Sequence, residues 1–271
     1  MTNYNCGKYI AMAIESIQHQ TCRDWELIIV DDRSTDFSDE VIRNKTLEDD
    51  RIVYLRNVVN VGCYASKNIG ITHCRGDWIT FQDADDHSLC DRLEQQLRCC
   101  MQHDVPCCVT TYLSRGNPQG NTAPGWTTAP ITLFIRAALL REKLGGFDPV
   151  RFGADTELLQ RLKVLQIPLH VLDRYTYSCL DKWIETERRT SLTGAPQTAT
   201  DTPIRLKYRE AYIEFHRFVS TSPKFAGQLR YTFPSPNRPF PLKKLSEAEQ
   251  ALFITPYEKI FQAAQHAHAV Q

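Results

Sequence analysis

Short apolar runs alternate with amphipathic segments along most of the chain. The apolar runs predict strands at 26–30, 51–55, 77–81, 107–113, 131–135 and 168–172. Apolar residues that recur every three to four positions predict helices at 8–20, 37–48, 63–74, 88–102, 155–166 and 256–267. This alternation predicts an α/β domain with a mostly parallel sheet flanked by helices. Such sheets bind ligands at the carboxyl ends of their strands.

The pattern changes in the last third of the chain. A polar stretch at 185–203 predicts a loop. Segment 203–245 carries nine Lys or Arg against two Glu, a net charge of +7, and its prolines make part of it extended. We therefore divide the chain into an α/β domain at 1–200 and a basic, Pro-containing helical C-terminal extension at 201–271. The basic charge suits either an anionic lipid surface or a solvated face.

Composition limits the class of protein further. The 271 residues are 42% hydrophobic and 24% charged, as in an ordinary globular protein. Lys+Arg and Asp+Glu both number 32, and this balance argues against a dedicated nucleic-acid binder. No stretch approaches the roughly 18 apolar residues of a membrane-spanning helix. The N-terminal residues contain no apolar leader, which predicts a cytoplasmic protein, with contact to the inner face of the membrane as an extension of that prediction.

Cysteine is frequent, with ten residues in the chain. A cytoplasmic protein is expected to keep them reduced. The pairs Cys99-Cys100 and Cys107-Cys108 lack Cys-x-x-Cys spacing, so we interpret them as small buried hydrophobic residues rather than as metal ligands. His170 alternates within a predicted strand and receives a structural interpretation.

The sharpest chemical feature is the acidic turn Asp83-Ala84-Asp85-Asp86, which directly follows a predicted strand. Two or three carboxylates on a tight turn make an oxygen-rich site for a hard cation such as Mg²⁺ or Mn²⁺. Such an ion would bridge a diphosphate and stabilise the charge that builds on it as a leaving group. The alternative is an ordinary acidic turn whose Asp residues cap the next helix.

Several motifs occur in order around this turn. They are Glu-Leu-Ile-Ile-Val-Asp-Asp-Arg-Ser-Thr-Asp (26–36), Asn60-Val-Gly62, Ser66-Lys67-Asn68-Ile-Gly70, and Gly76-Asp-Trp-Ile-Thr-Phe-Gln-Asp-Ala-Asp-Asp (76–86). Met1-Thr-Asn-Tyr-Asn lies upstream, and Gly145-Gly-Phe-Asp-Pro and Gly153-Ala-Asp-Thr-Glu-Leu lie downstream. Over about residues 1–165 the series resembles the signature of the family 2 glycosyltransferases, which are nucleotide-sugar enzymes of the GT-A (Rossmann-like) fold.

The resemblance implies a nucleotide-sugar site along the strand ends. Asp32 would hydrogen-bond the base, a uracil or thymine ring. The other donor-side residues would be Thr2, Tyr4 and Asn5 near the base, Asn60, Gly62, Lys67 and Asn68 along the nucleotide-sugar, and Arg189 over the diphosphate. Lys67 stands where the family more often has Arg, which keeps the charge but loses the bidentate fork. The segment around Arg189 is equally compatible with a solvated linker.

The resemblance also implies a metal site and a catalytic base. Asp83 and Asp85 would meet ribose, diphosphate and Mn²⁺ or Mg²⁺, with Asp86 as a further ligand. Asp155 would be the general base that deprotonates the acceptor hydroxyl. The family usually has Glu-Asp here, whereas this chain has Ala-Asp and therefore lacks one carboxylate. Glu157 is a candidate to take over part of that carboxylate's catalytic role. An N-cap role for Asp155 is the structural alternative.

The first strand of the family normally lies before the Thr-x-Tyr-Asn motif, and here only Met1 precedes that motif. We therefore expect the first, central strand to be truncated. Neighbouring strands would then carry unpaired backbone groups, each costing about 1–3 kcal/mol if buried.

Together these features predict a metal-dependent, inverting glycosyltransferase of the hexosyltransferase type. It would move a sugar from a UDP- or dTDP-sugar to a hydroxyl of a glycan or lipid-linked acceptor in bacterial cell-surface polysaccharide synthesis, substrate classes that come from the resemblance. The alternative is a truncated, non-catalytic relative that binds nucleotide or a partner protein. A nucleotidyltransferase would need a Gly-rich phosphate-binding loop near the N-terminus, where only the isolated Gly7 occurs.

Overall fold

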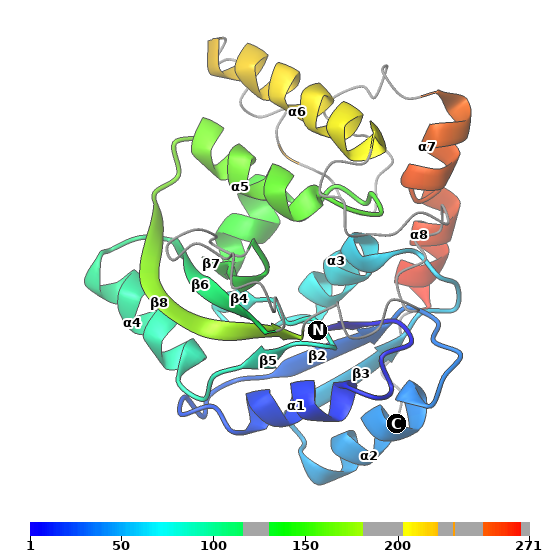
Figure 1. Ribbon diagram of the computed structural model, residues 1–271, viewed down its shortest axis with the longest axis vertical. Helices are drawn as coiled ribbons and strands as arrows, with labels where there is room; N and C mark the ends of the chain where they lie inside the picture. The colour runs from blue at the N-terminus through cyan, green and yellow to red at the C-terminus, as the bar shows by residue number, and fades with distance from the viewer. Residues whose placement is uncertain (116–129, 181–202, 222–229, 231–245, 267–271) are drawn as a thin grey trace.

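The described part of the chain forms two sheets flanked by helices (Figure 1). The computed structural model describes residues 1–115, 130–180, 203–221, 230 and 246–266. The first sheet is parallel, with the strand order β1 (Thr2–Asn3), β2 (Leu27–Asp31) and β3 (Ile52–Arg56). The helices that connect these strands and lead on from them are α1 (Ile10–Gln18), α2 (Ser38–Glu48) and α3 (Cys63–His73).

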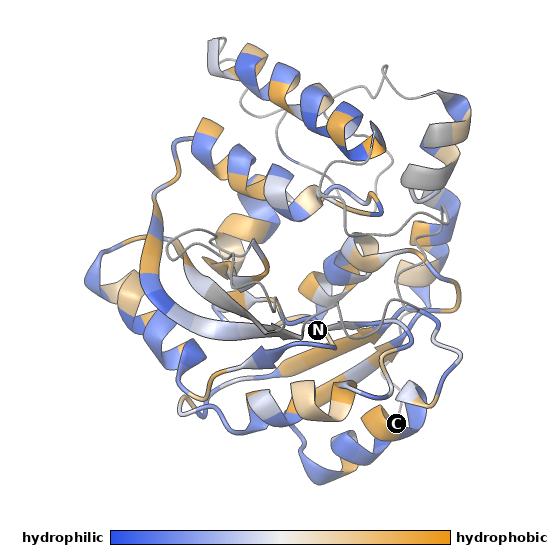
Figure 2. Ribbon diagram, in the orientation of Figure 1, coloured by the Kyte–Doolittle hydropathy of each residue, from blue (hydrophilic) through white to orange (hydrophobic). Residues whose placement is uncertain are grey.

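Strand β2 is buried on both faces because helices cover both of them. Leu27 and Ile29 pack against α1 and α2, whereas Ile28 and Val30 pack against α3. Successive side chains of a strand point to opposite faces, so a doubly covered strand needs a continuous apolar run. Figure 2 shows β2 coloured hydrophobic along most of its length. Helix α8 (Tyr257–Gln265) adds Ile260 to the core on the α3 face.

The second sheet is mixed. Its strand order is β4 (Trp78–Thr80), β7 (Phe134–Arg136), β6 (Cys107–Arg115), β8 (Leu169–Leu180) and β5 (His87–Ser88). β6 and β8 run parallel, while β7 is antiparallel to β4 and β6, and β5 is antiparallel to β8. One face packs on α4 (Arg92–Gln102), and the other on α5 (Ala154–Val164) and the π-helix Leu139–Leu144. The predicted α/β class is confirmed, and the antiparallel pairs are confined to this second sheet.

Three predicted elements have different bounds. The strand predicted at 131–135 divides into a 3₁₀ turn at Pro130–Thr132 and the short strand β7, because proline suits the first turn of a helix. The helix predicted from 88 begins at Arg92, since the two residues of β5 pair with β8 instead. β8 continues beyond the predicted end at 172 to Leu180.

The first strand is present but comprises only two residues. Thr2 and Asn3 pair with β2, and Thr2 also forms a parallel bridge with Asp83, directly after β4. β1 therefore joins the two sheets. A cavity of about 690 Å³ is lined by residues of β2 and β4 together with Met1 and Thr2.

Helix α6 (Pro203–Thr221) packs on α5 (Figure 1). Tyr208 and Tyr212 of α6 belong to the same apolar core as Leu158 and Leu162 of α5. Helix α7 (Glu247–Phe253) precedes α8 near the end of the described chain. Within the described ranges, the boundary expected near 200 thus does not separate two cores. None of the helices described is both long and apolar enough to cross a membrane.

Candidate active site

Two consecutive carboxylates end β2. Asp31 is fully buried and accepts a hydrogen bond from Nδ2 of Asn3 at 2.6 Å and one from the backbone N–H of Ser34 at 2.8 Å. It therefore ties β1 to the turn that follows β2.

Asp32 is also buried, and its carboxylate accepts three hydrogen bonds. The donors are the backbone N–H groups of Val61 at 2.8 Å and Gly62 at 2.7 Å, and Nδ2 of Asn57 at 2.9 Å. Burial raises the pKa of Asp32 even though these donors oppose the shift. The carboxylate fixes the start of α3, where Gly62 is the N-cap with a φ of +88° that favours glycine. The base-binding role of Asp32 stays a prediction.

Asn60 connects the turn after β2 to Arg151, a cation that the sequence interpretation missed. Nδ2 of Asn60 donates to the backbone oxygen of Asp32 at 2.9 Å, and Nη1 of Arg151 donates to Oδ1 of Asn60 at 2.7 Å. Burial lowers the pKa of Arg151, while Asp32 and Tyr4 act in the opposite direction. A side chain at Gly62 would lie 3.1 Å from Cδ of Arg151. The glycine thus leaves room for the guanidinium beside the donor-side turn.

Lys67 is a buried cation that faces the acidic turn. Its Nζ lies 3.2 Å from Oδ1 of Asp83, and its side chain is 7% exposed. Burial alone would lower the pKa of Lys67, but the charges of Asp83, Cys63 and Asp155 raise it well above its ordinary value. Lys67 therefore stays protonated, and it links the predicted metal turn to the predicted base.

The acidic turn is held by the backbone and by Tyr177 of β8. The N–H of Asp83 donates to the Tyr177 hydroxyl at 3.0 Å, and the N–H of Asp86 donates to the oxygen of Asp83 at 3.2 Å. Nε2 of Gln82 donates to the oxygen of Asp86 at 2.8 Å, and Arg92 donates to Oε1 of Gln82 at 3.2 Å. The turn is therefore built into the second sheet.

The donor set of this turn fits a hard divalent cation. The Asp83 side chain is 36% exposed and Asp85 is half-buried, so both carboxylates are accessible. Asp86 is only 3% exposed, and its charge acts on the buried Arg92 and Tyr177. Oxygen ligands of this kind suit Mg²⁺ or Mn²⁺. Asp83 and Asp85 are thus more accessible to an ion than Asp86, and the role of all three as metal ligands stays a prediction.

Asp155 lies in the first turn of α5 and is half-buried. The N-cap of α5 is Gly153, which excludes the alternative N-cap role for Asp155. The hydroxyl of Tyr64 hydrogen-bonds the Asp155 carboxylate, and burial together with that carboxylate raises the pKa of Tyr64 well above its ordinary value. Asp155 also acts on the charge of Lys67. The predicted base and the predicted metal turn therefore belong to one electrostatic cluster.

The expectation that Glu157 shares the catalytic work is wrong. Its side chain has no exposed surface and lies 2.9 Å from Nη2 of Arg161 and 3.1 Å from Nε2 of His216. Arg161 also donates to the backbone oxygens of Leu144 at 2.6 Å and Gly146 at 2.8 Å. Glu157 therefore joins α5 to α6 and to the segment before α5.

Asn68 does not face a donor pocket as the resemblance implied. It is 2% exposed, and its amide group pairs with the backbone of Phe147 in both directions, with two hydrogen bonds of 2.8 Å. The amide group of Asn68 thus links α3 to the segment 145–147 through hydrogen bonds.

The N-terminal residues of the predicted donor site lie beside the turn that follows β2. Tyr4 is 53% exposed, and Oγ1 of Thr2 lies 3.3 Å from Sγ of Cys63. Asn5 has a φ of +54°, and its Oδ1 accepts from the backbone N–H of Thr35 at 2.8 Å. Tyr4 is thus the accessible member of this group. Arg189 lies outside the described residues.

The structure adds three residues to this site: Tyr64, Arg151 and Tyr177. Tyr64 precedes Lys67 by three positions, a helical spacing that places both on one face of α3 and was available from the sequence. Arg151 and Tyr177 reach the site through tertiary contacts, so the motifs carried no signal for them.

Similar proteins share the part of the chain that carries this site. The family model described as Glycosyl transferase family 2 matches residues 1–163. An uncharacterized glycosyltransferase of Haemophilus influenzae is 40% identical over 105 residues, which are 39% of this chain and 42% of that protein. The UDP-Glc:alpha-D-GlcNAc-diphosphoundecaprenol beta-1,3-glucosyltransferase WfgD of Escherichia coli is 33% identical over 107 residues, 39% of this chain and 41% of that protein. The matched segments thus span about two fifths of these relatives.

Solved structures extend the likeness over more of the chain. TarS 1-349 of S. aureus, in complex with UDP-GlcNAc, has a TM-score of 0.63 at 20% identity and covers 80% of this chain and 64% of that chain. The mannosyltransferase PcManGT of Pyrobaculum calidifontis, in complex with GDP-Man and Mn²⁺, has a TM-score of 0.56 at 16% identity and covers 97% of this chain and 84% of that chain. At these identities the likeness shows the fold, which is the GT-A fold.

Proposed function

The chain belongs to glycosyltransferase family 2, and on that basis we propose that it transfers a sugar from a nucleotide-sugar to a hydroxyl of a glycan or lipid-linked acceptor. The observation that carries the proposal is the cluster in which Asp83 and Asp155, from separate segments of the fold, both act on the charge of the buried Lys67. A donor diphosphate beside Asp83 and an acceptor hydroxyl beside Asp155 would meet within this cluster.

On the donor side, Lys67 holds the orientation of Asp83 and supplies a fixed positive charge next to the diphosphate. Mn²⁺ or Mg²⁺, held by Asp83 and Asp85, would supply further positive charge that neutralises the departing nucleoside diphosphate. The exposed Tyr4 and the guanidinium of Arg151 lie beside the turn after β2, where the base and ribose would bind.

On the acceptor side, a carboxylate oxygen of Asp155 accepts the proton of the attacking hydroxyl. The acceptor's hydroxyl oxygen then bonds to the anomeric carbon from the face opposite the diphosphate as the bond from that carbon to the diphosphate oxygen breaks, which inverts the configuration. The Tyr64 hydroxyl orients the carboxylate through its hydrogen bond. A positioned base of this kind contributes about 10²–10⁴-fold to the rate.

A UDP-sugar is the first donor to test, and a dTDP-sugar the second. The E. coli relative takes UDP-Glc and a diphosphoundecaprenol-linked acceptor by its name, and TarS binds UDP-GlcNAc. These names support a lipid-linked acceptor in cell-surface polysaccharide synthesis. PcManGT binds GDP-Man, so GDP-sugars belong in the test as well.

The test is release of nucleoside diphosphate from UDP-, dTDP- and GDP-sugars, with Mn²⁺ and with EDTA. Metal-dependent release from one nucleotide class is the expected result. Asp85→Ala should abolish this metal-dependent release. Asp50→Asn, which changes an exposed carboxylate outside the site, is the control. Donor binding without release under all conditions would instead support a non-catalytic relative, which the Ala at position 154 in place of the family's Glu favours.

We further propose that α6 contacts the inner face of the membrane. Leu206 and Phe218 on this helix are 40% and 48% exposed, and Arg209 and Arg217 are also exposed. Basic groups near an anionic surface add about 1 kcal/mol each to binding. Pelleting with anionic liposomes at low salt and release at high salt would support this contact, and equal absence of pelleting in both would refute it.

A further inference from the structure

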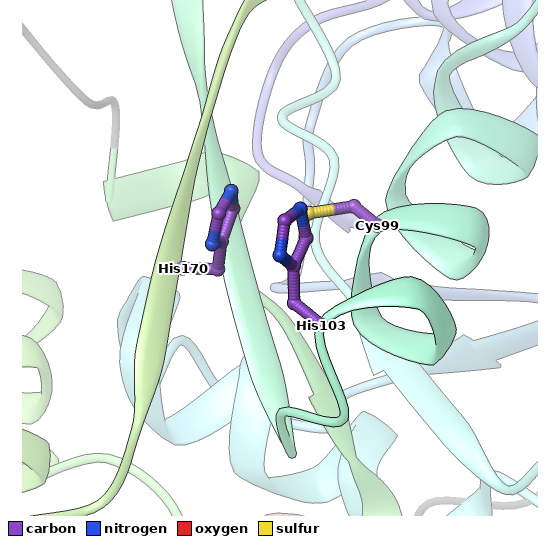
Figure 3. Close-up of side chains that lie close together, drawn as sticks. All are labelled: Cys99, His103 and His170. Atoms are coloured by element: carbon purple, nitrogen blue, oxygen red, sulfur yellow. The ribbon is translucent and has the colours of Figure 1, made fainter.

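A cysteine and two histidines converge on the side of the second sheet that faces α4 (Figure 3). Cys99 is the eighth residue of α4, His103 is the C-cap of that helix, and His170 is the second residue of β8. Each offers one ligand atom, and these atoms all lie within 4.8 Å of one another. The rings of His103 and His170 are stacked, with centroids 3.8 Å apart and an angle of 16° between the planes.

The fold fixes these three side chains from two sides. Cys99 and His103 are four residues apart, a spacing that places two helical side chains on one face. His170 is held by the parallel pairing of β8 with β6, in which it stands opposite Cys108. Cys99 and Cys108 belong to one apolar cluster between α4 and the sheet. The three side chains therefore meet because the core packs, and since imidazole lone pairs lie in the ring plane, one of the stacked rings must rotate for both histidines to bind one ion.

We propose that Cys99, His103 and His170 form a binding site for a thiophilic divalent metal ion, with Zn²⁺ as the best match. Cysteine thiolates and imidazoles are both common Zn²⁺ ligands, and a site with three protein ligands leaves the fourth position to water or another small ligand. The hard ions Mg²⁺ and Mn²⁺ prefer carboxylates, so the site is chemically distinct from the acidic turn. The proposal adds a metal-binding role to the structural interpretation of Cys99 and His170.

The exposure of the three ligands suits entry of an ion from solvent. Cys99 is 5% exposed, His170 is half-buried and His103 is exposed. Burial, aided by His103, lowers the pKa of His170, which favours the neutral imidazole that binds metal. The Cys99 thiol releases its proton to water as the sulfur–metal bond forms.

The site lies far from the acidic turn along β8. His170 is seven residues before Tyr177, whose hydroxyl supports Asp83. At about 3.3 Å per residue, that is on the order of 20 Å of strand. A metal at this position would join the end of α4 to the start of β8, which is a structural task separate from sugar transfer.

Cobalt provides the test, because a Co²⁺–thiolate bond gives a near-ultraviolet charge-transfer absorption that carboxylate ligands do not give. The full chain is titrated with Co²⁺ under reducing conditions, and Zn²⁺ is then added as competitor. We expect one equivalent of Co²⁺ to produce the thiolate band and Zn²⁺ to remove it. Cys99→Ala and His170→Ala should abolish the band, while Cys90→Ala and His19→Ala, at exposed positions, should keep it.

His103→Gln tests the site in a variant that is expected to fold, because His103 is exposed and its replacement leaves the core unchanged. This variant should weaken Co²⁺ binding by at least about tenfold, as loss of support around a metal does. A wild-type chain that shows no thiolate band would overturn the proposal. A band that survives Cys99→Ala, or an affinity unchanged by His103→Gln, would overturn it as well.

Discussion

Asp155 and Glu157 are two carboxylates on the same turn of α5 with opposite surroundings. Asp155 is half-buried and hydrogen-bonded to Tyr64, whereas Glu157 is enclosed between Arg161 and His216. Residues two apart on a helix do not face the same way, which explains how neighbours in sequence reach different environments. The two residues therefore call for two different measurements.

Asp155→Asn should lower kcat/KM for sugar transfer by about 10²–10⁴-fold, because the amide cannot accept the acceptor's proton. Nucleotide binding should remain, since the substitution leaves the acidic turn and Lys67 in place. Transfer kinetics and calorimetric titration with UDP measure the two quantities. Normal transfer by this variant, with Asp50→Asn as the matched control, would show that the base is another group.

Glu157→Gln should lower the free energy of unfolding by about 3 kcal/mol, because it leaves the buried charge of Arg161 without its partner. Urea denaturation measures the loss, with the exposed Glu210→Gln as control. The folded fraction should still bind nucleotide. An unchanged urea midpoint would contradict the structural role given to Glu157.

Asp49 gives the stability a pH dependence of known sign. Hydrogen bonds from Arg51, at 2.7 and 2.9 Å, lower the pKa of Asp49 from 3.8 to about 2. A pKa that is lowered in the folded state stabilises the protein at pH values above 3.8, the pKa in the unfolded chain. That stabilisation is lost as the pH falls through about 2.

Asp49→Asn should therefore be less stable than the wild type near neutral pH, by about 1 kcal/mol for this partly exposed ion pair. The difference should shrink as the pH is lowered below about 4. Thermal melts across this range measure it, and a difference that stays constant or grows in acid would rule out the ion pair as its source.

At the scale of elements, α3 connects the donor and acceptor sides. Tyr64 reaches Asp155, Lys67 reaches Asp83, and Asn68 reaches Phe147 in the segment before α5. Lys67 and Asn68 come three and four residues after Tyr64, so the three side chains lie on adjoining parts of one helical face. The backbone conformation of 145–147 is then part of the geometry of the site.

Gly146→Ala tests that connection. Gly146 has a φ of +90°, and an added Cβ would come closer than 3.0 Å to Oδ1 of Asn68. We expect a loss of about 1–3 kcal/mol in the free energy of unfolding, from backbone strain together with the damaged Asn68 contacts. Gly76→Ala, where the nearest heavy atom would be at 3.5 Å, should change stability little. Equal effects of the two substitutions would contradict this view of the segment.

Most elements could be predicted from periodicity, because β2 and the helices around it bury continuous or amphipathic apolar faces. The exceptions depend on distant partners. β5 exists only because β8 passes beside His87 and Ser88. The buried residues of α4 include Arg92 and Gln96, which form a hydrogen bond of 3.1 Å with each other. A hydropathy pattern cannot predict a buried arginine, because it assigns charged residues to the surface.

The candidate site was predictable to the extent that motifs fix residue types. Asp83, Lys67 and Asp155 do lie in one cluster. Motifs do not record what surrounds a side chain, so Glu157 and Asn68 were placed in the chemistry although both are enclosed by structural contacts.

At the scale of the whole molecule, the proposed donor site draws on both sheets. Asp32 follows β2 of the first sheet, and Asp83 follows β4 of the second. A ligand that binds both turns would stabilise the junction between the sheets as well as its own contacts.

UDP with Mn²⁺ should therefore raise the free energy of unfolding by mass action, by about 2.7 kcal/mol at a ligand concentration 100 times Kd, and Tm should rise with it. EDTA should remove the metal-dependent part of the shift, and Asp85→Ala should lack that part from the start. Differential scanning fluorimetry measures both. A full shift in Asp85→Ala would place the metal ligands elsewhere.

The two-residue strand that joins the sheets also bears on how the chain folds. Thr2 pairs with β2 and bridges to Asp83, so its contacts lie far away along the chain. Contacts of this kind form only after large loops have closed, and they slow folding compared with local helical contacts. The helices can therefore form early in refolding, whereas the junction that aligns Asp32 with Asp83 is completed last, and recovery of nucleotide binding should lag behind recovery of helicity.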